Sequence, residues 1–408
     1  MTMKIDLGTF PQDWMTTGPA HKVYQALDRA GGSPRFVGGC VRDGLLGRKI
    51  RDIDIATPLD PAAVMKAADA AGLKHVPTGI DHGTVTVVAD HTGIEVTTLR
   101  RDVETFGRHA TVAFTDDWRE DAARRDLTMN ALSADASGKI YDYFEGTADL
   151  QSGKVRFVGA PEDRMREDYL RVLRYFRFHA DYAAGDFDPP ALTAARALKA
   201  ELKSLSGERL RQETLKLLLA KRGVETWRSM LAEGIVDAFL PEATTIDRMA
   251  KVAALESRLK VKPDPIRRLA ALTVTGSGLA VAETLKLSNI ERDRLLAVTA
   301  PRPDFSVQDP TLVRRQIYDL GNALALDLLL VDWSEPEIDW QRAYEIVRDW
   351  ARPDFALKGR DVSALGVPAG PEIGRLLKDL EAWWIAGDFA ADREHCLAEL
   401  RRRIGGMK

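Results

Sequence analysis

The hydrophobic pattern of the chain changes near residue 160, and this change limits the folds that the sequence can adopt. Before that point, β-branched runs bounded by turn residues predict strands over 35–39, 52–56, 83–90 and 94–100. Residues 61–72 predict a helix, with Pro near its first turn and Gly after its end. After that point Ala, Leu, Arg and Glu dominate, and the pattern is helical almost throughout. We therefore expect an α/β head followed by a long helical body.

Length and charge limit the organisation and the partners. The 408 residues are too many for one ordinary core, and we expect a head over 1–158, a neck over 159–242 and a body with a tail over 243–408. The net charge of −3 gives no general attraction to nucleic acid, so an anionic partner must be met by a local basic surface.

The cysteine content and the lengths of the apolar runs indicate the cellular compartment that we expect for the chain. Only Cys40 and Cys396 occur, which argues against a disulfide framework and favours a reducing environment. The first residues lack the pattern of a signal peptide, and the apolar runs fall short of the roughly 20 residues that span a membrane. We expect a cytoplasmic protein with no membrane partner.

Residues 36–57, FVGGCVRDGLLGRKIRDIDIAT, combine adjacent glycines with an Asp-x-Asp sequence. Gly38 and Gly39 let the backbone approach a phosphate closely, and Arg42 can neutralise that phosphate. Residues i and i+2 of a strand point to one face about 6–7 Å apart, so Asp52 and Asp54 project together. A divalent cation relieves the repulsion between them, and Mg²⁺ suits oxygen ligands beside phosphates. A solvent-exposed alternating strand also explains an isolated Asp-x-Asp.

This stretch resembles the signature of the class II tRNA nucleotidyltransferase and bacterial poly(A) polymerase family, a branch of the DNA polymerase β-like superfamily. The resemblance implies an α+β fold, in which a polymerase β-like head with a mixed sheet precedes an all-helical neck, body and tail. It implies phosphate binding by Gly38, Gly39, Arg42 and Asp43, and catalysis with two Mg²⁺ ions at Asp52 and Asp54. Glu95, on the strand GIEVTTLR, is the candidate for a third carboxylate, and a structural role is its alternative.

Two further segments resemble motifs of the same family. RRDLTMNAL, which begins at residue 124, matches the R-R-D-[FL]-T-x-N-A motif and implies that Arg124, Arg125 and Asn130 bind the nucleotide or its phosphates. Residues 101–115 resemble the flexible loop of the family, which includes Gly107, Arg108 and His109. Composition alone would make this segment a surface loop. Because members limited to CC addition are expected to lack it, the loop favours a chain that can also add A.

Residues 161–180 predict one helix with two contrasting faces. At about 100° per residue, one face holds Tyr169, Val172, Leu173, Phe176 and Ala180, a core stripe of ordinary width. The opposite face holds Asp168, Arg171, Arg174, Tyr175 and Phe178. A solvated charged face is the simple explanation. However, an Asp and an Arg one turn apart also present the acceptor and the donors that can hydrogen-bond the edge of C or A.

EDYLR, at residues 167–171, resembles the E-D-x-x-R motif with which this family selects the incoming nucleotide. The resemblance implies that Asp168 and Arg171 select the base and that Glu167 supports them. It also implies that Arg174 and Arg177 lie near the nucleotide or its phosphates.

The motifs together imply a tRNA nucleotidyltransferase that adds C-C-A to the 3′ end of tRNA from CTP and ATP, without a nucleic-acid template. The substrate is a tRNA that lacks its 3′ CCA, the helical body holds the tRNA, and no obligatory protein partner is evident. A poly(A) polymerase shares every motif and is the main alternative. A non-catalytic RNA-binding relative is the second, although both Asp52 and Asp54 are present. A dinucleotide-dependent enzyme is excluded, because no glycine fingerprint with an acidic ribose ligand occurs.

Overall fold

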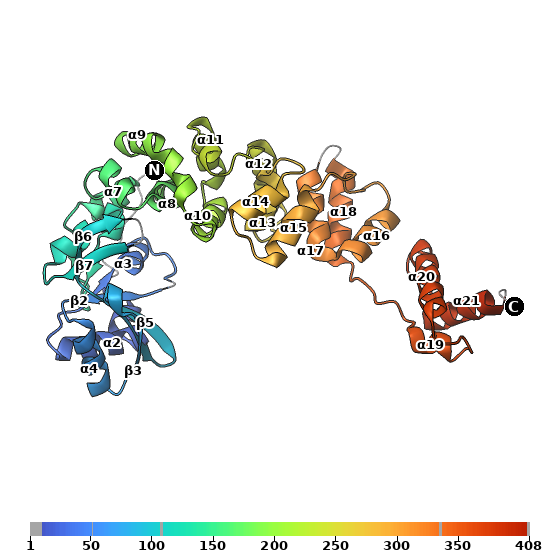
Figure 1. Cartoon of the computed structure of the whole chain (residues 1–408), viewed down its shortest axis with the longest axis horizontal. Helices are drawn as coiled ribbons and strands as arrows, with labels where there is room; N and C mark the ends of the chain where they lie inside the picture. Colours follow the sequence, from blue (N-terminus) through green and yellow to red (C-terminus); the bar gives the residue numbers. More distant parts are fainter. Residues whose placement is uncertain (1–9, 51, 107–108, 334–336, 406–408) are drawn as a thin grey trace. The chain divides into compact units, whose positions relative to one another are not determined.

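The computed structural model describes residues 10–50, 52–106, 109–333 and 337–405 (Figure 1). The chain divides into two compact units. The first is Met1–Thr244 with Glu283–Lys286, and the second is Thr245–Ala282 with Leu287–Lys408. The three-part division over 1–158, 159–242 and 243–408 stays a prediction. The expected fold class, a head with a mixed sheet followed by helices, is confirmed.

The first unit contains a seven-stranded mixed sheet, in the order β3-β4-β5-β2-β1-β8-β9. The four predicted strands are present, with ends that differ by a few residues. The strands of this sheet are β1 (Arg35–Val37), β2 (Asp54–Thr57), β3 (Lys74–Gly79), β4 (Thr84–Ala89), β5 (Thr92–Thr98), β8 (Ser133–Ala134) and β9 (Ile140–Tyr141). A separate hairpin consists of β6 (Arg100–Phe106) and β7 (His109–Phe114).

Helices α2 (Gly18–Arg29) and α4 (Pro61–Ala70) pack against the sheet (Figure 1). The predicted helix over 61–72 is therefore confirmed as α4. Its N-cap is Asp60, whose side chain accepts a hydrogen bond from the Ala63 backbone N–H, and Pro61 fills the first turn, where no donor is needed. Strand β4 alternates half-buried and buried residues, as expected for a sheet with one face in a core.

The other helices of the first unit surround the sheet or extend the chain beyond it. Near the sheet lie α1 (Asp13–Thr16), α3 (Gly39–Leu45), α5 (Trp118–Ala123) and α6 (Gly146–Ser152). Later in the chain come α7 (Pro161–Glu167), α8 (Leu170–Tyr182), α9 (Pro189–Leu198), α10 (Gly207–Leu219) and α11 (Gly223–Ala232). Helix α8 packs against both α10 and α11, which fixes the position of its side chains.

The prediction of one continuous helix over 161–180 is wrong. The helix stops at Glu167, and Asp168 is extended, with φ −156° and ψ 107°. Two contacts of the Asp168 carboxylate explain the break. It accepts a hydrogen bond from the Leu170 backbone N–H at 3.1 Å, and it forms an ion pair with Arg209 at 2.6 Å. A short polar side chain that bonds the backbone ahead of it competes with helix continuation.

The prediction for the two faces of this helix is partly confirmed. Val172, Leu173, Phe176 and Ala180 are buried, whereas Tyr169 is half-buried. Tyr175 and Phe178, which were placed on the polar face, are also buried. The reason is that α8 is covered on more than one side, so its aromatic residues enter the core, while its arginines and Asp181 stay partly exposed.

The second unit is helical throughout its described part. Its helices are α12 (Ile246–Arg258), α13 (Pro265–Leu272), α15 (Asn289–Thr299), α16 (Pro310–Leu320), α17 (Asn322–Asp332), α18 (Glu337–Asp349), α19 (Gly359–Ser363), α20 (Pro371–Ala386) and α21 (Arg393–Gly405), while α14 (Gly278–Thr284) spans the boundary between the units. Leu380, Trp384, Cys396 and Leu400 form part of a buried cluster that joins α20 and α21. Among the described residues, we find no helix with the length and apolar character needed to cross a bilayer.

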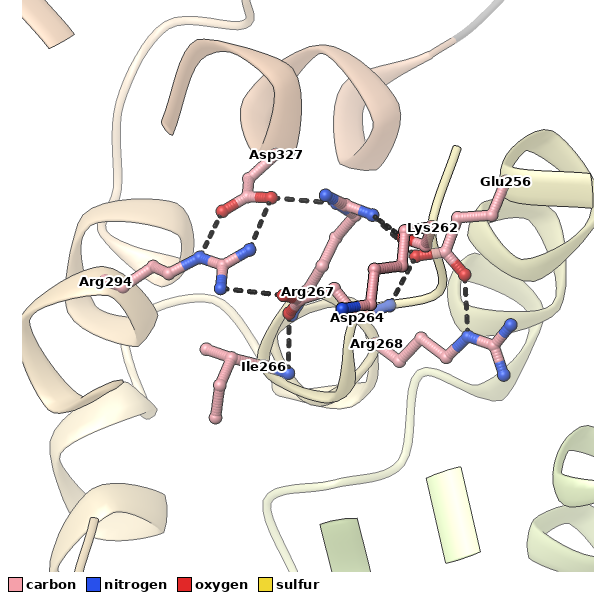
Figure 2. Close-up of polar contacts among 8 residues, drawn as sticks. All are labelled: Glu256, Lys262, Asp264, Ile266, Arg267, Arg268, Arg294 and Asp327. Atoms are coloured by element: carbon pink, nitrogen blue, oxygen red, sulfur yellow. Dashed lines mark hydrogen bonds and ion pairs between the residues drawn. The ribbon is translucent and has the colours of Figure 1, made fainter. Parts of the chain in front are cut away.

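A buried ionic cluster connects four helices of the second unit (Figure 2). Asp327 on α17 is fully buried and accepts hydrogen bonds from Arg267 on α13 and from Arg294 on α15, both at 2.8 Å. Glu256 on α12 accepts from Arg267 at 2.7 Å and from Arg268 at 2.8 Å. Because buried charges are costly unless they are paired, this cluster fixes the relative positions of these helices.

Candidate active site

The adjacent glycines form the turn between β1 and α3. Gly38 has φ +71°, a conformation that side chains rarely adopt, and a Cβ atom there would lie 3.0 Å from the Arg125 guanidinium. Arg42 is buried, and its guanidinium donates to both oxygens of Asp43, at 2.9 and 2.8 Å, and to the Asn130 side-chain oxygen at 2.5 Å. The structure therefore brings together Gly38, Arg42, Asp43, Arg125 and Asn130, as the motifs imply.

The carboxylates lie where β2 begins. Asp54 is the first residue of β2, whereas Asp52 precedes the strand and is exposed. The strand therefore begins two residues later than predicted. On the neighbouring parallel strand β5, Glu95 is the register partner of Asp54. Burial, together with the charges of Glu95 and Asp52, raises the pKa of Asp54 to about 6, although Arg125 acts in the opposite direction.

A second buried carboxylate organises the arginine pair. Asp121 on α5 accepts a hydrogen bond from Arg124 at 2.9 Å and one from Arg125 at 3.2 Å. Burial alone would raise the pKa of Asp121, but the two guanidiniums outweigh it and hold this pKa below its usual value. Arg125 also donates to the Asn130 backbone carbonyl at 3.4 Å. Arg125 lies beside Gly38, and both arginines line the same cavity as the glycine turn.

The predicted base-selecting residues lie at the break between α7 and α8, but they are not paired with each other. Asp168 pairs with Arg209, as described above. Arg171 pairs with Glu167, which also accepts a hydrogen bond from Arg164 at 2.9 Å. Asp168 and Arg171 are thus each bound by a different, oppositely charged residue. These ion pairs fix the orientation of both side chains before a ligand binds.

Two further arginines of α8 are held by buried carboxylates. Arg174 pairs with Asp126 at 2.6 Å, and Asp126 also accepts a hydrogen bond from the Asn130 amide at 3.0 Å. Burial would raise the pKa of Asp126, but Arg174 and these hydrogen bonds hold it well below its usual range. Arg177 pairs with Glu213 on α10, and the same carboxylate lies 3.9 Å from the Arg174 guanidinium.

A cavity of about 430 Å³ brings most of the predicted residues together. Its wall contains five guanidiniums and three carboxylates, which suits an anionic ligand. It is lined by Gly38, Gly39, Arg42, Asp54, Arg124, Arg125, Asp126, Asn130, Asp168, Arg171, Arg174 and Phe178.

A second cavity of about 640 Å³ shares Gly39, Arg42 and Asp54 with the first. It is lined in addition by Cys40, Asp43, Arg48, Lys49, Ile50, Asp52, Arg177, Asp181, Tyr182, Lys216, Leu219 and Ala220. The predicted site is therefore split: Asp43, Asp52 and Arg177 face this cavity and not the first. Glu95 and Glu167 line neither cavity; Glu95 is the register partner of Asp54, and Glu167 pairs with Arg171.

The flexible-loop prediction can be followed only in part. Gly107 and Arg108 lie outside the described residues, and His109 begins β7. Phe178 and Arg209 are not among the predicted site residues. Phe178 lies on the same helix as Arg174 but was counted only with its polar face, and Arg209 lies on α10, outside every motif quoted above.

Comparisons with known proteins cover most of the chain. Residues 34–156 match the family described as "Poly A polymerase head domain", and residues 186–246 match "Probable RNA and SrmB- binding site of polymerase A". The chain is 34% identical to the mitochondrial CCA tRNA nucleotidyltransferase 1 of Danio rerio, over 90% of this chain and 86% of the relative. It is 31% identical to the CCA-adding enzyme of Levilactobacillus brevis, over 93% of this chain and 96% of the relative.

The fold also matches solved structures. The crystal structure of the Bacillus stearothermophilus CCA-adding enzyme in complex with CTP superimposes with a TM-score of 0.69 and 28% identity, and the match covers 94% of this chain and 96% of that one. The Thermotoga maritima CCA-adding enzyme complexed with tRNA is 20% identical, with a TM-score of 0.65 over 94% of each chain. The second likeness concerns the fold alone.

Proposed function

We infer how this chain works from one premise: it belongs to the class II CCA-adding enzyme and poly(A) polymerase head family of the nucleotidyltransferase superfamily. It is a CCA tRNA nucleotidyltransferase (EC 2.7.7.72), since relatives with this activity match nearly its full length. The roles of individual residues, the number of metal ions and the way the tRNA is held are our proposals.

We propose that the first cavity holds the incoming nucleotide. The observation that carries this proposal is that one cavity joins the glycine turn, a cluster of arginines and Asp54 to Asp168 and Arg171. Arg42, Arg124, Arg125 and Arg174 are placed to neutralise a triphosphate, because each is already oriented by a buried carboxylate or amide. Asp168 and Arg171 then present an acceptor and a donor fork to the edge of the base, for CTP first and for ATP afterwards.

The carboxylates fit a divalent cation. Asp54 has a raised pKa because it is buried beside Glu95 and Asp52, and a bound cation would remove that penalty. Among the described residues there is no cluster of three or more His, Cys, Asp or Glu side chains that could hold a metal alone. This agrees with Mg²⁺, which typically binds one or two carboxylates and completes its shell with substrate oxygens and water. We propose two ions at Asp52 and Asp54.

The protein contributes mainly position and charge. When bound, the metal ions would activate the 3′ hydroxyl and stabilise the leaving pyrophosphate. Asp54 lies between the two cavities, so its carboxylate is where the attacking oxygen and the α-phosphate must meet. The arginines bind the triphosphate and keep it in line, and Asp168 with Arg171 accepts only bases with matching edges. Glu95 orients Asp54 and raises its affinity for a cation.

The substrates follow from these roles. CTP and ATP enter the first cavity, and the acceptor is a tRNA that lacks its 3′ CCA. We propose that the arginine-rich helices α8 and α10 bind the tRNA backbone, and that the helical second unit also holds the tRNA through its backbone and shape. We propose a cytoplasmic location, supported by the two buried free cysteines; the Danio rerio relative is named as mitochondrial.

The experiment that tests these roles is nucleotide incorporation by Asp54→Ala, with Mg²⁺ and a tRNA that lacks its 3′ end. We expect no transfer of C or A, together with a folded protein by circular dichroism. Undiminished incorporation would contradict the assignment of Asp54. The second candidate, poly(A) polymerase, would show as a long A ladder in the wild type without CTP.

A further inference from the structure

An aromatic pair on α8 lies among the arginines of the candidate site. Phe178 and Tyr182 are one helical turn apart, and their rings stack with centroids 5.6 Å apart and an interplanar angle of 25°. Both residues are buried, with exposed fractions of 4% and 7%. Phe178 lines the first cavity, and Tyr182 lines the second. The stacked rings therefore belong to the walls of both cavities.

Three guanidiniums lie over the Phe178 ring, within the roughly 6 Å at which the negative face of an aromatic ring attracts a cation. Their central carbons are 5.2, 5.4 and 4.2 Å from the ring centroid, for Arg42, Arg174 and Arg177. Arg42 also lies over the Tyr182 ring, at 4.4 Å. Since Arg42 and Arg174 line the first cavity, the ring of Phe178 contacts two of the groups that we assign to the triphosphate.

The ring supports these arginines in a different way from their carboxylate partners. Three N–H donors at the edge of the Arg42 guanidinium bond Asp43 and Asn130, and Arg174 pairs with Asp126. A carboxylate offsets the charge of the arginine that it holds, whereas an aromatic ring attracts the cation and carries no net charge of its own. The ring can therefore keep like charges close together in one cavity while it leaves their positive charge available to a phosphate.

We propose that Phe178 is a positioning residue for the triphosphate: its ring, stacked on Tyr182, holds the guanidiniums of Arg42 and Arg174 in place in the first cavity. This inference rests on the proposed binding of the incoming nucleotide in that cavity. It extends the proposed function by assigning to Phe178 a role in the affinity for the phosphates and none in the selection of the base. The alternative is a purely structural role, in which Phe178 only fills the core.

The test separates binding of the phosphates from binding of the rest of the nucleotide. CTP, CDP and CMP share the base and the ribose and differ in their phosphates, and Phe178→Leu keeps an apolar side chain but removes the ring face. With Mg²⁺ and a tRNA that lacks its 3′ end, we expect KM for CTP to rise about tenfold, from the loss of two partly desolvated cation–π contacts. The competitive inhibition constant of CMP should stay nearly the same, and that of CDP should rise by less than KM for CTP. Phe178→Tyr keeps the ring and should restore KM for CTP.

Two further variants make the result specific. Phe176→Leu removes another buried ring of α8, whose ring contacts are with Tyr175 and Phe187, and it should leave all three constants unchanged. A fluorinated phenylalanine at position 178 keeps the shape of the ring and withdraws electrons from its face. KM for CTP should therefore rise with each added fluorine, a measurement that does not depend on the folding of Phe178→Leu.

The constants also show how the proposal would fail. Equal changes for CTP and CMP in Phe178→Leu would indicate the purely structural role and overturn the proposal, as would no change for either. Arg174→Ala separates this failure from a failure of the proposed function. A higher KM for CTP in Arg174→Ala, with Phe178→Leu unaffected, would overturn only the role of the ring. An unchanged KM for CTP in both variants would also contradict nucleotide binding in the first cavity.

Discussion

At the scale of single residues, Asp54 is a place where catalysis and stability oppose each other. Its pKa is raised to about 6 in the folded chain, because it is buried beside Glu95 and Asp52. An unfolded Asp titrates near 4. Between these two values the folded chain binds more protons than the unfolded chain, so the free energy of unfolding falls as the pH rises from about 4 to about 6. Above that window the charged carboxylate destabilises the fold.

Asp54→Asn is therefore expected to stabilise the protein while it abolishes transfer. At pH 7.5 the gain in the free energy of unfolding is at most about 3 kcal/mol, the value of two pKa units, and solvent screening reduces it. At pH 4 the gain should be much smaller, because the wild-type carboxyl is already protonated. Thermal unfolding of both proteins at the two pH values measures this difference. A variant that melts below the wild type at pH 7.5 would contradict the account.

Metal binding should depend on the same carboxylate. Anything that binds only the folded chain raises its Tm, so Mg²⁺ should raise the Tm of the wild type at neutral pH and EDTA should reverse the shift. The shift should be absent or much reduced in Asp54→Asn. Asp28→Asn, which removes an exposed carboxylate of α2, serves as the matched control and should keep the full shift. Equal shifts in all three proteins would show that Mg²⁺ binds elsewhere.

At the scale of secondary structure, the break between α7 and α8 positions the base-selecting pair. Extended backbone at Asp168 lets its carboxylate turn toward Arg209 on α10, while Arg171 stays on the first turn of α8. A continuous helix would keep both side chains on one straight face. Because of the break, Asp168 and Arg171 are oriented by separate ion pairs, with Arg209 and with Glu167.

Arg209→Ala tests this arrangement. Without its ion pair, the Asp168 carboxylate keeps the hydrogen bond from the Leu170 N–H as its one contact with the described residues, and it can rotate. We expect discrimination between correct and incorrect nucleotides, measured as a ratio of kcat/KM values, to fall by about tenfold, as for the loss of one oriented hydrogen bond. Arg209→Lys should recover part of it, since the charge remains but the planar fork does not. Unchanged discrimination in Arg209→Ala would mean that Asp168 needs no support from α10.

The sequence predicts the part of this site whose residues lie close together along the chain. Gly38, Gly39, Asp52 and Asp54 lie within one segment, and their spacing on a turn and a strand is enough to group them. Arg209 pairs with Asp168 across 41 positions, a contact that no periodicity reports. Tyr175 was placed on a polar face because a helix with one covered side was assumed, whereas α8 is covered by both α10 and α11.

At the scale of the whole molecule, the residues of both cavities belong to one compact unit, and the buried ionic cluster belongs to the other. Asp327→Ala leaves the guanidiniums of Arg267 and Arg294 without their shared carboxylate. Removing one partner of a buried ion pair costs about 3–5 kcal/mol. Because the chain has two units, this loss should loosen the second without unfolding the first.

Hydrogen exchange on the full-length chain can resolve this difference. Peptides from α12, α13, α15 and α17 should exchange faster in Asp327→Ala, and peptides from β2, β4 and β5 should not change. If the second unit holds the tRNA, KM for the tRNA should rise while KM for CTP stays the same. Asp293→Ala, an exposed carboxylate on α15, is the control. Faster exchange in peptides from both units would contradict the expectation that the second unit loosens without the first.

The most direct test of the account is nucleotide choice at the first cavity. Wild type and Asp168→Ala are each given a tRNA that lacks its 3′ end, Mg²⁺ and the four nucleotides, singly and then as CTP with ATP, and product lengths are read on a gel. The account predicts that the wild type adds two C and one A and then stops, and that Asp168→Ala incorporates UTP and GTP as well. A variant that still adds only C and A would contradict base selection by Asp168, and with it the central claim.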